Sequence, residues 1–183
     1  APVAVTAAPE PQAIRVDTGA HSDTITALAS DGRVLLTASA DGTARLWDLR
    51  GGAPRGTLRP PQDAAPGDGS LHAAALSSDG RRVFLAGYTQ FYDLSRSLGS
   101  STYVFERSGE LFRRIPGEQP RRGYATEEII RDLSLSPDGQ RVAVARLSGG
   151  ANVYLAGSGA VLRGAESLDG LTLDHDAAGL LYV

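Results

Sequence analysis

A pattern that recurs four times along this 183-residue chain constrains its fold more than any other feature. Each copy has an apolar segment interrupted by polar residues, a tight turn that ends in glycine, and a second apolar segment. The copies lie at residues 25–36, 71–85, 130–144 and 171–183. Such alternation is typical of half-buried β-strands, and the Asp-Gly pairs in the first three turns provide the positive φ that hairpin turns require. The chain is therefore predicted to contain four β-hairpins of one design.

Two more short apolar segments follow each of the first three hairpins. They are residues 43–49 and 54–58, 102–106 and 111–115, and 152–155 and 161–163. The turn glycines Gly32, Gly80, Gly139 and Gly179 are 48, 59 and 40 residues apart, which suits propeller blades of about 40–45 residues with insertions. Four short antiparallel strands per repeat are typical of one β-propeller blade. We predict an all-β fold, an incomplete β-propeller with blades at about 20–59, 71–116 and 129–164 and a half blade at 170–183.

Residues 19–49 resemble a WD40 repeat. The motifs that carry the resemblance are Gly-x-His at the start, Asp-Gly in the second turn and Trp-Asp at the end of the third strand. In that family a histidine, a serine or threonine, an aspartate and a tryptophan form a buried hydrogen-bonded chain, which satisfies the indole N–H and the carboxylate. The resemblance implies a structural tetrad of His21, Thr37, Asp41 and Trp47, with Ser39 on the same strand face as Thr37.

The later repeats depart from this pattern. Where the first repeat has Leu-Trp-Asp, the second has Val-Phe-Glu at residues 104–106 and the third has Tyr-Leu-Ala at residues 154–156. Neither retains the full tetrad. We therefore expect the tryptophan-centred network in the first blade alone and apolar packing in the others.

The segments on either side of the first blade resemble one particular group of WD40 proteins. Residues 15–19 lead into this blade, residues 58–61 leave it, and the second blade has a long insertion before its third strand. This arrangement is similar to the WD40 portion of exported bacterial proteins that carry a caspase-like (metacaspase-type) peptidase domain. All 18 basic residues are arginines, as is typical of GC-rich bacterial genomes. Residues 1–12 are predicted to be a flexible leader; a periplasmic or secreted location is favoured, and a cytoplasmic one stays open.

Motifs that carry chemistry are scarce. Without cysteine there is no cysteine zinc site, no cysteine nucleophile and no Cys-His pair of a peptidase; without lysine there is no P-loop. No Gly-x-Ser-x-Gly elbow leads from a strand into a helix. Each histidine has an interpretation other than catalysis: His21 in the tetrad, His72 at a strand end or surface, and His175 in a turn at 174–176 rather than a metal site. We predict no enzymatic activity, no metal and no cofactor.

Charge and hydropathy exclude two classes of partner. The net charge of −3 provides no footprint for nucleic acid or an anionic membrane surface. No apolar run approaches the roughly 20 residues that cross a bilayer. The remaining partners are a protein, a peptide or a neighbouring domain of the same chain.

Two features suggest where such a partner docks. A basic cluster is interpreted either as a solvated loop of mixed charge or as a docking patch for an acidic segment. A pair of aromatic residues beside a polar insertion forms either recognition anchors or a lid over the propeller edge. The cluster contains Arg113, Arg114, Arg121 and Arg122, and the aromatic pair is Phe91 and Tyr92.

The leading hypothesis for function is a non-catalytic WD40-repeat scaffold for protein interactions, as part of a longer bacterial protein. The alternative is a regulatory or substrate-recruiting module of a caspase-like peptidase whose catalytic domain lies outside this segment. A propeller hydrolase is disfavoured because it needs inward acidic or histidine residues from several blades. Because three and a half blades do not close a ring, we also expect open apolar blade faces that drive self-association. The apolar faces between blades are expected to include Val34, Leu36, Val142 and Val144.

Overall fold

The computed structural model describes residues 19–61, 69–87, 100–116, 130–146, 150–165, 174–175 and 181–182. Within these ranges the regular structure is entirely β: twelve strands form three four-stranded antiparallel sheets, and two more form a short hairpin. No helix in the described ranges is long and apolar enough to cross a membrane. The predicted all-β fold is confirmed, and the three sheets are consistent with a WD40-type propeller that does not close a ring within the described residues. The predicted leader at residues 1–12 lies outside them.

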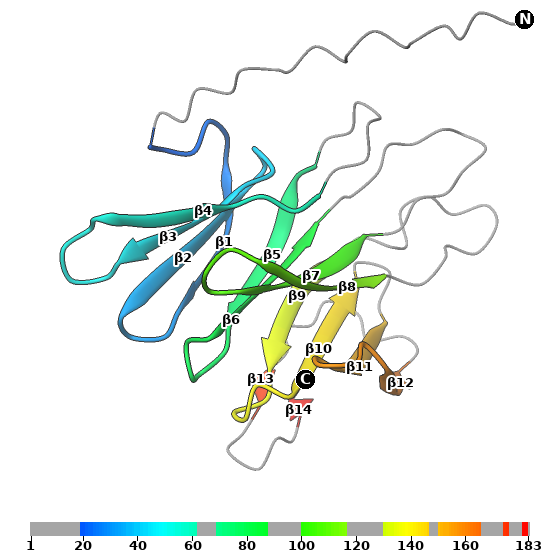
Figure 1. Ribbon diagram of the computed structural model, residues 1–183. Coiled ribbons are helices and arrows are strands. Elements are labelled where there is room, and N and C mark those ends of the chain that lie inside the picture. Colours follow the sequence, from blue (N-terminus) through cyan, green and yellow to red (C-terminus); the bar gives the residue numbers. More distant parts are fainter. Residues whose placement is uncertain are drawn as a thin grey trace, which may run out of the picture.

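Each sheet is a meander in which consecutive strands pair, and the three sheets are called blades 1 to 3 (Figure 1). Blade 1 contains β1 (Ile25–Ser30), β2 (Val34–Ser39), β3 (Ala44–Asp48) and β4 (Pro54–Leu58). Blade 2 contains β5 (Leu71–Leu76), β6 (Arg82–Gly87), β7 (Ser101–Glu106) and β8 (Leu111–Pro116). Blade 3 contains β9 (Ile130–Leu135), β10 (Arg141–Arg146), β11 (Ala151–Leu155) and β12 (Val161–Ala165). The final hairpin contains β13 (Asp174–His175) and β14 (Leu181–Tyr182).

The turn between the first two strands of each blade follows from its Asp-Gly pair. Gly32, Gly80 and Gly139 have φ values of 83°, 66° and 65°, a region that residues with a Cβ atom rarely adopt. In blade 1, a carboxylate oxygen of Asp31 accepts hydrogen bonds from the backbone N–H groups of Arg33 and Val34. Short-range hydrogen bonding of this kind closes the hairpin, which is why the turns could be recognised from the sequence.

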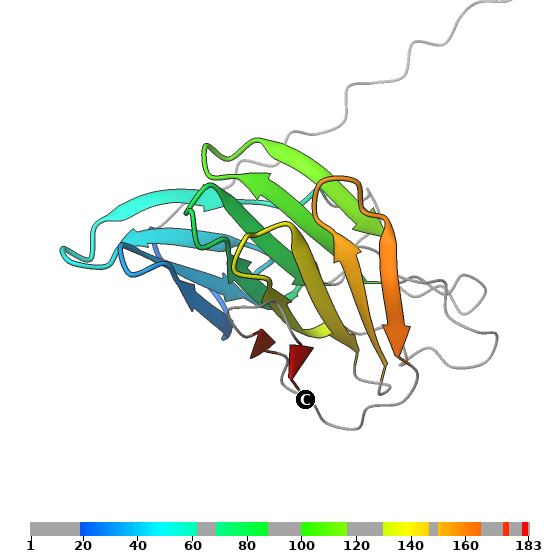
Figure 2. The same ribbon diagram turned by 90° about the horizontal axis from the view of Figure 1, so that it is seen from below.

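The three sheets stack face to face (Figure 2), and the two larger apolar clusters of the described residues each lie between neighbouring blades. A smaller cluster of Ala143, Ala145 and Ala151 lies within blade 3. The layer between blades 1 and 2 includes Val34, Leu36, Leu46, Leu71, Leu85 and Tyr103. The layer between blades 2 and 3 includes Phe84, Val104, Ile115, Leu133, Val142 and Tyr154. Blade 2 is therefore covered on both faces, because alternate residues of its strands point into different layers.

The prediction that Val34, Leu36, Val142 and Val144 belong to the apolar faces between blades is confirmed. All four are buried, because they project from β2 and β10 toward blade 2. The large apolar side chains that blade 1 exposes are Ile25 and Leu28 on β1 and Leu49 after β3, and Leu28 has 64% of its surface accessible.

Polar contacts hold blades 1 and 2 together at both ends of the strands. At one end, the Thr26 hydroxyl donates to the carbonyl oxygen of Leu71 at 2.6 Å. At the other end, Nη1 of Arg107 in blade 2 lies 3.1 Å from Oδ2 of Asp31 in blade 1 and donates to the carbonyl oxygen of Gly80 at 3.0 Å. Asp31 and Gly80, the two residues that Arg107 contacts, lie in turns, so the guanidinium connects the turn of one blade to the turn of the next.

The last described segment of the chain differs from the prediction. The turn predicted at residues 174–176 is wrong for its first two residues, because Asp174 and His175 form strand β13 and pair with Tyr182 and Leu181. Backbone pairing with β14 replaces the local turn there. Asp176 lies outside the described residues.

Candidate functional site

Four side chains of blade 1 form a continuous hydrogen-bonded chain. Nδ1 of His21 lies 3.0 Å from Oδ2 of Asp41, and Nε2 of His21 lies 2.7 Å from Oγ1 of Thr37. The indole N–H of Trp47 donates to the same threonine oxygen at 2.9 Å. Every group is satisfied when the Thr37 hydroxyl donates to Nε2 and the Nδ1–H of His21 donates to Asp41. The structure thus brings together the four residues that the sequence singled out.

Among the four side chains of this network, the Asp41 carboxylate makes the most hydrogen bonds. Oδ2 accepts from His21 and from the backbone N–H of Ser22, while Oδ1 accepts from the backbone N–H and the hydroxyl of Thr43. Burial raises the pKa of Asp41, but the hydrogen bonds from Thr43, Ser22 and His21 outweigh burial and lower the pKa to about 2. Asp41 is therefore an anion at neutral pH, with its acceptor sites occupied by the protein.

Thr43 and Ser39, which lie next to the tetrad, hold the turn that carries Asp41. Thr43 was missed, although its position two residues after Asp41 is a recognisable signal for an Asx-type turn. The Ser39 hydroxyl does not join the chain of four; it donates to the carbonyl oxygen of Asp23 and accepts from the backbone N–H of Asp41. Ser39 thereby holds the turn that carries the aspartate.

Blades 2 and 3 do not rely on apolar packing alone, because each has a polar contact on the strand that corresponds to β3, namely β7 and β11. Glu106 of blade 2 forms an ion pair with Arg82, at 3.4 Å between Oε1 and Nε. In blade 3, the buried Asn152 side chain donates to the hydroxyl oxygen of Tyr154 at 3.2 Å. Neither blade contains a second tryptophan.

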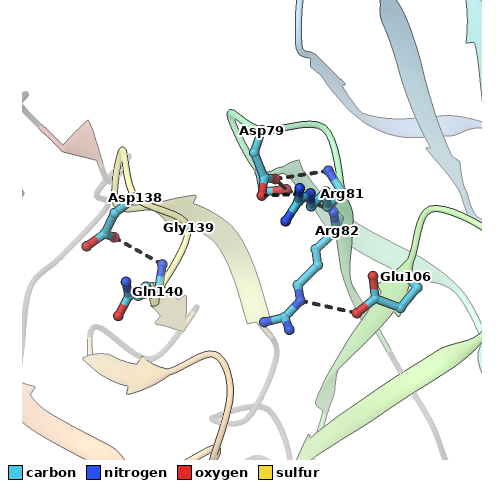
Figure 3. A pocket seen from close by; sticks show the side chains of 8 residues that line it. Asp79, Arg81, Arg82, Glu106, Asp138, Gly139 and Gln140 are labelled. Atoms are coloured by element: carbon cyan, nitrogen blue, oxygen red, sulfur yellow. Dashed lines mark hydrogen bonds and ion pairs between the residues drawn. The ribbon is translucent and has the colours of Figure 1, made fainter.

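A polar cleft of about 250 Å³ lies between blades 2 and 3. Figure 3 shows the turn 138–140 of blade 3 on one side and the charged side chains of blade 2 on the other. Its lining residues are Ser77, Asp79, Arg81, Arg82, Glu106, Asp138, Gly139 and Gln140. This volume is below the roughly 300–1,000 Å³ of a typical small-molecule site. The cleft has room for one or two side chains of a partner.

The two aspartates of the cleft are held by their own turns. Oδ1 of Asp79 accepts from the Ser77 hydroxyl and from the backbone N–H of Arg81. Oδ1 of Asp138 has the same two contacts in blade 3, from the Ser136 hydroxyl and the backbone N–H of Gln140. The serine hydroxyl is the main cause of the lowered pKa of each aspartate, followed by the backbone N–H. Both carboxylates thus use part of their acceptor capacity within the protein.

The arginines of the cleft have fewer internal contacts. Arg81 has 83% of its side chain exposed, and its Nε lies 3.9 Å from Oδ2 of Asp79. The guanidinium of Arg82 lies 4.2 Å from the ring centre of Phe112 on β8, which places an exposed aromatic ring against the cleft. Stacking of this type orients an arginine, while the N–H groups in the plane of the guanidinium remain available for hydrogen bonds.

Comparison with known proteins identifies part of the chain. Residues 14–48 match the family described as WD domain, G-beta repeat. The chain contains a WD40 repeat. The match includes His21, Thr37, Asp41 and Trp47, and it ends at the last residue of β3. No curated protein matches the chain significantly.

The predicted interaction surface outside the WD40 repeat is described only in part. Arg113 and Arg114 lie exposed on β8, the edge strand of blade 2. Nε of Arg114 donates to the Ser101 hydroxyl at 3.0 Å, and Arg113 lies 5.9 Å from the ring centre of Phe112. The other four members, Phe91, Tyr92, Arg121 and Arg122, lie outside the described residues.

The cleft itself was not predicted. A signal was present in the Asp-Gly-Arg-Arg run at residues 79–82, where two arginines follow a turn glycine. The remaining histidine predictions concern His72, which is half-buried within β5, and His175, whose backbone belongs to β13. Among the described residues, no group of three or more histidine, aspartate or glutamate side chains lies close enough to hold a metal ion.

Proposed function

We propose that this chain is a protein-interaction scaffold without catalytic activity of its own. The observation that carries the proposal is the WD40 repeat at residues 14–48 within a series of propeller-type sheets. WD40 repeats typically mediate protein interactions. The polar cleft between blades 2 and 3 and the exposed edge strand β8 supply surfaces on which a partner can dock.

The hydrogen-bonded chain in blade 1 has the connectivity of a catalytic triad. Thr37, His21 and Asp41 follow the order of nucleophile, base and orienting acid. However, Thr37 and the side chains of His21 and Asp41 are only 5%, 5% and 7% exposed, so a substrate cannot reach the hydroxyl. The hydroxyl also accepts the indole N–H of Trp47. We therefore assign a structural role to this tetrad: it connects the turn 40–43 and the segment before β1 to β2 and β3.

The test of the scaffold proposal is partner capture by the full-length protein in its own cells. We expect one or a few proteins to be retained in near-stoichiometric amounts after a high-salt wash. The purified protein is expected to show no turnover of peptide or ester substrates. A protein that captures no partner, and that hydrolyses a substrate in a manner abolished by Thr37→Val, contradicts the proposal.

A narrower function is a regulatory or substrate-recruiting module for a caspase-like peptidase. Its support is the sequence resemblance in residues 15–19 and 58–61 and the arginine-only basic composition. In this proposal the blades form one partial propeller over residues 13–183, preceded by the leader at 1–12. Reading the complete gene tests it: a peptidase domain with a Cys-His pair in the same reading frame supports the proposal, and its absence contradicts it.

A further inference from the structure

The residue after the third strand makes the same backbone contact in each of the three blades. Its N–H group donates to the carbonyl oxygen of the residue that follows the turn glycine. The pairs are Leu49 with Arg33 in blade 1, Arg107 with Arg81 in blade 2, and Ala156 with Gln140 in blade 3. Arg107 and Ala156 are therefore equivalent positions of two repeats. Each lies against the preceding blade, since Arg107 contacts Asp31 of blade 1 and Ala156 belongs to the apolar layer between blades 2 and 3.

At the boundary between blades 1 and 2, the Arg107 guanidinium fills the space beside the turns. Its Nη1 lies 3.1 Å from Oδ2 of Asp31 and 3.0 Å from the carbonyl oxygen of Gly80. Asp31 and Ser77 are equivalent, because the N–H of each donates to the carbonyl oxygen of the first residue of the next strand. Gly80 and Gly139 are the turn glycines of blades 2 and 3. At the next boundary, the place of this guanidinium is therefore bounded by Ser77 and Gly139.

The boundary between blades 2 and 3 has a cleft in this place. Ser77 and Gly139 both line the cleft, which has a volume of about 250 Å³. The methyl side chain of Ala156 does not reach into it, because Ala156 is fully buried. The described residues provide no donor for the carbonyl oxygen of Gly139, whereas the equivalent oxygen of Gly80 accepts from Arg107. Blades 2 and 3 thus lack the guanidinium that connects blades 1 and 2.

The charges that line the cleft favour a cation as its occupant. The lining contains three carboxylates, those of Asp79, Glu106 and Asp138, and two guanidiniums, those of Arg81 and Arg82. Arg82 is held by its ion pair with Glu106. Arg81 is 83% exposed and lies 3.9 Å from Asp79, so another cation can replace it there. No described residue lies within ion-pair distance of Asp138. The lining therefore carries a net negative charge.

We infer that this cleft binds the guanidinium of an arginine side chain from a partner protein. The guanidinium donates to the carbonyl oxygen of Gly139 and to Oδ2 of Asp79, and the Asp138 carboxylate adds negative charge. Arg107 provides the pattern within the same molecule, because it lies between a carboxylate and a turn carbonyl oxygen. A planar fork with five N–H donors suits two acceptors better than an ammonium group does. The inference rests on the proposed scaffold function and specifies the side chain that a partner inserts.

The experiment uses a blocked peptide with one arginine flanked by glycine and serine. The peptide is titrated into the full-length protein and followed by saturation-transfer NMR. We expect saturable binding with a Kd of about 1 mM, weakened by added salt. A peptide with citrulline in place of arginine has nearly the same shape without the charge and is expected not to bind. A lysine peptide is expected to bind about threefold more weakly or less tightly still.

Variants of the cleft residues test the site itself. Asp79→Asn and Asp138→Asn retain the Oδ1 acceptor of each turn and are expected to weaken binding about threefold to fivefold. Arg81→Ala removes the cation that competes for Asp79 and is expected to strengthen binding about threefold. An acidic ligand would respond to Arg81→Ala in the opposite direction.

Asp23→Asn and Arg33→Ala are the matched control variants. Asp23 and Arg33 are exposed residues of blade 1 and its preceding segment, and both lie outside the cleft. Each control changes the net charge as the corresponding cleft variant does, so both are expected to bind the arginine peptide like the unmodified protein. Circular dichroism melting of all variants checks that they remain folded.

Several outcomes overturn the inference. They are the absence of saturable binding of the arginine peptide, equal binding of the citrulline, lysine or a glutamate peptide, and weaker binding by Arg81→Ala. Equal weakening by Asp23→Asn and Asp79→Asn also overturns it, because binding then follows the net charge of the protein. Captured partners without binding of the arginine peptide leave the scaffold proposal intact and overturn the cleft assignment. Binding of the arginine peptide without any captured partner supports the cleft assignment and contradicts the scaffold proposal.

Discussion

The guanidinium of Arg107 in blade 2 lies 3.1 Å from the carboxylate of Asp31 in blade 1. The Asp31 side chain is 6% exposed, and Arg107 also donates to the carbonyl oxygen of Gly80. Burial raises the pKa of Asp31, but backbone N–H groups of Val34 and Arg33 together with Arg107 lower it below its ordinary value. This ion pair therefore couples the positions of two turns in adjacent blades.

Removing Arg107 is expected to destabilise the protein more than removing an exposed arginine. Arg107→Ala leaves the buried Asp31 carboxylate without its cation and is expected to lower the free energy of unfolding by about 1–2 kcal/mol. Arg55→Ala removes the partner of Asp48, an exposed pair at the edge of blade 1, and is expected to cost about 0.5 kcal/mol or less. Urea unfolding of the full-length protein measures both. Equal effects of the two variants contradict the role of Arg107.

Gly80 and Gly32 provide a matched pair of turn positions. Both have positive φ, so alanine at either position strains the backbone at a cost of about 1 kcal/mol. At Gly80 a Cβ atom also lies 2.7 Å from Nη1 of Arg107 and 2.8 Å from Oδ2 of Asp31, whereas at Gly32 it meets nothing within 4 Å. Gly80→Ala is therefore expected to cost about 1 kcal/mol more than Gly32→Ala, measured by thermal and urea unfolding. In the double variant Gly80→Ala, Arg107→Ala this additional cost is expected to become smaller, because only the close approach to Oδ2 of Asp31 remains.

The hydrogen bonds of the tetrad in blade 1 are expected to contribute to the free energy of unfolding. Asp41→Ala removes the acceptor of His21, Ser22 and Thr43 and is expected to cost roughly 1–3 kcal/mol. Thr37→Val removes the partner of Trp47 and is expected to cost a similar amount, while Thr37→Ser retains the hydroxyl and recovers part of it. The free energy of unfolding of the intact protein is the measurement. A neutral effect of Asp41→Ala would count against a structural role for the tetrad.

The lowered pKa of Asp41 predicts a dependence of stability on pH. The pKa falls from an ordinary value of 3.8 to about 2 in the folded protein, so between these values the unfolded chain binds a proton that the folded chain does not. The stabilisation is fully present above the unfolded pKa and is lost as pH falls toward 2; its size is on the order of 2 kcal/mol. Asp41→Asn lacks this titration. Because Asp31, Asp79 and Asp138 titrate in both proteins, the difference between their unfolding profiles from pH 5 to pH 2 isolates Asp41; parallel profiles exclude the predicted effect.

The burial of Thr37 predicts that its hydroxyl is chemically inert. We expect a fluorophosphonate probe to leave Thr37 unmodified when the folded protein is analysed by peptide mass spectrometry. A reactive serine hydrolase treated in parallel shows that the probe is active. A stoichiometric adduct on Thr37 that Asp41→Asn abolishes supports catalysis and refutes the proposed structural role.

The hairpins and the tetrad were predictable because their signals are local or lie within one repeat. The Asp-Gly turns act over a few residues: an aspartate accepts nearby backbone N–H groups, and glycine adopts positive φ at Gly32, Gly80 and Gly139. The tetrad residues fall within residues 21–47, and a recognised repeat pattern connects them. Alternation of apolar residues likewise predicted the strands, since side chains on a strand point to two faces in turn.

Contacts between blades could not be read from these local rules. Asp31 and Arg107 are far apart in the sequence, and no sequence signal near either residue indicates the other as its partner. The same holds for Val34 and Leu36, which alternation marked as one face of a strand; burial against Leu71 and Leu85 depends on how blade 2 stacks on blade 1. The cleft combines a turn of blade 2 with a turn of blade 3, each of which is closed by its own serine and aspartate. Hydrogen bonds within a turn are determined by backbone geometry over a few residues, whereas the space between two turns is determined by the packing of whole sheets.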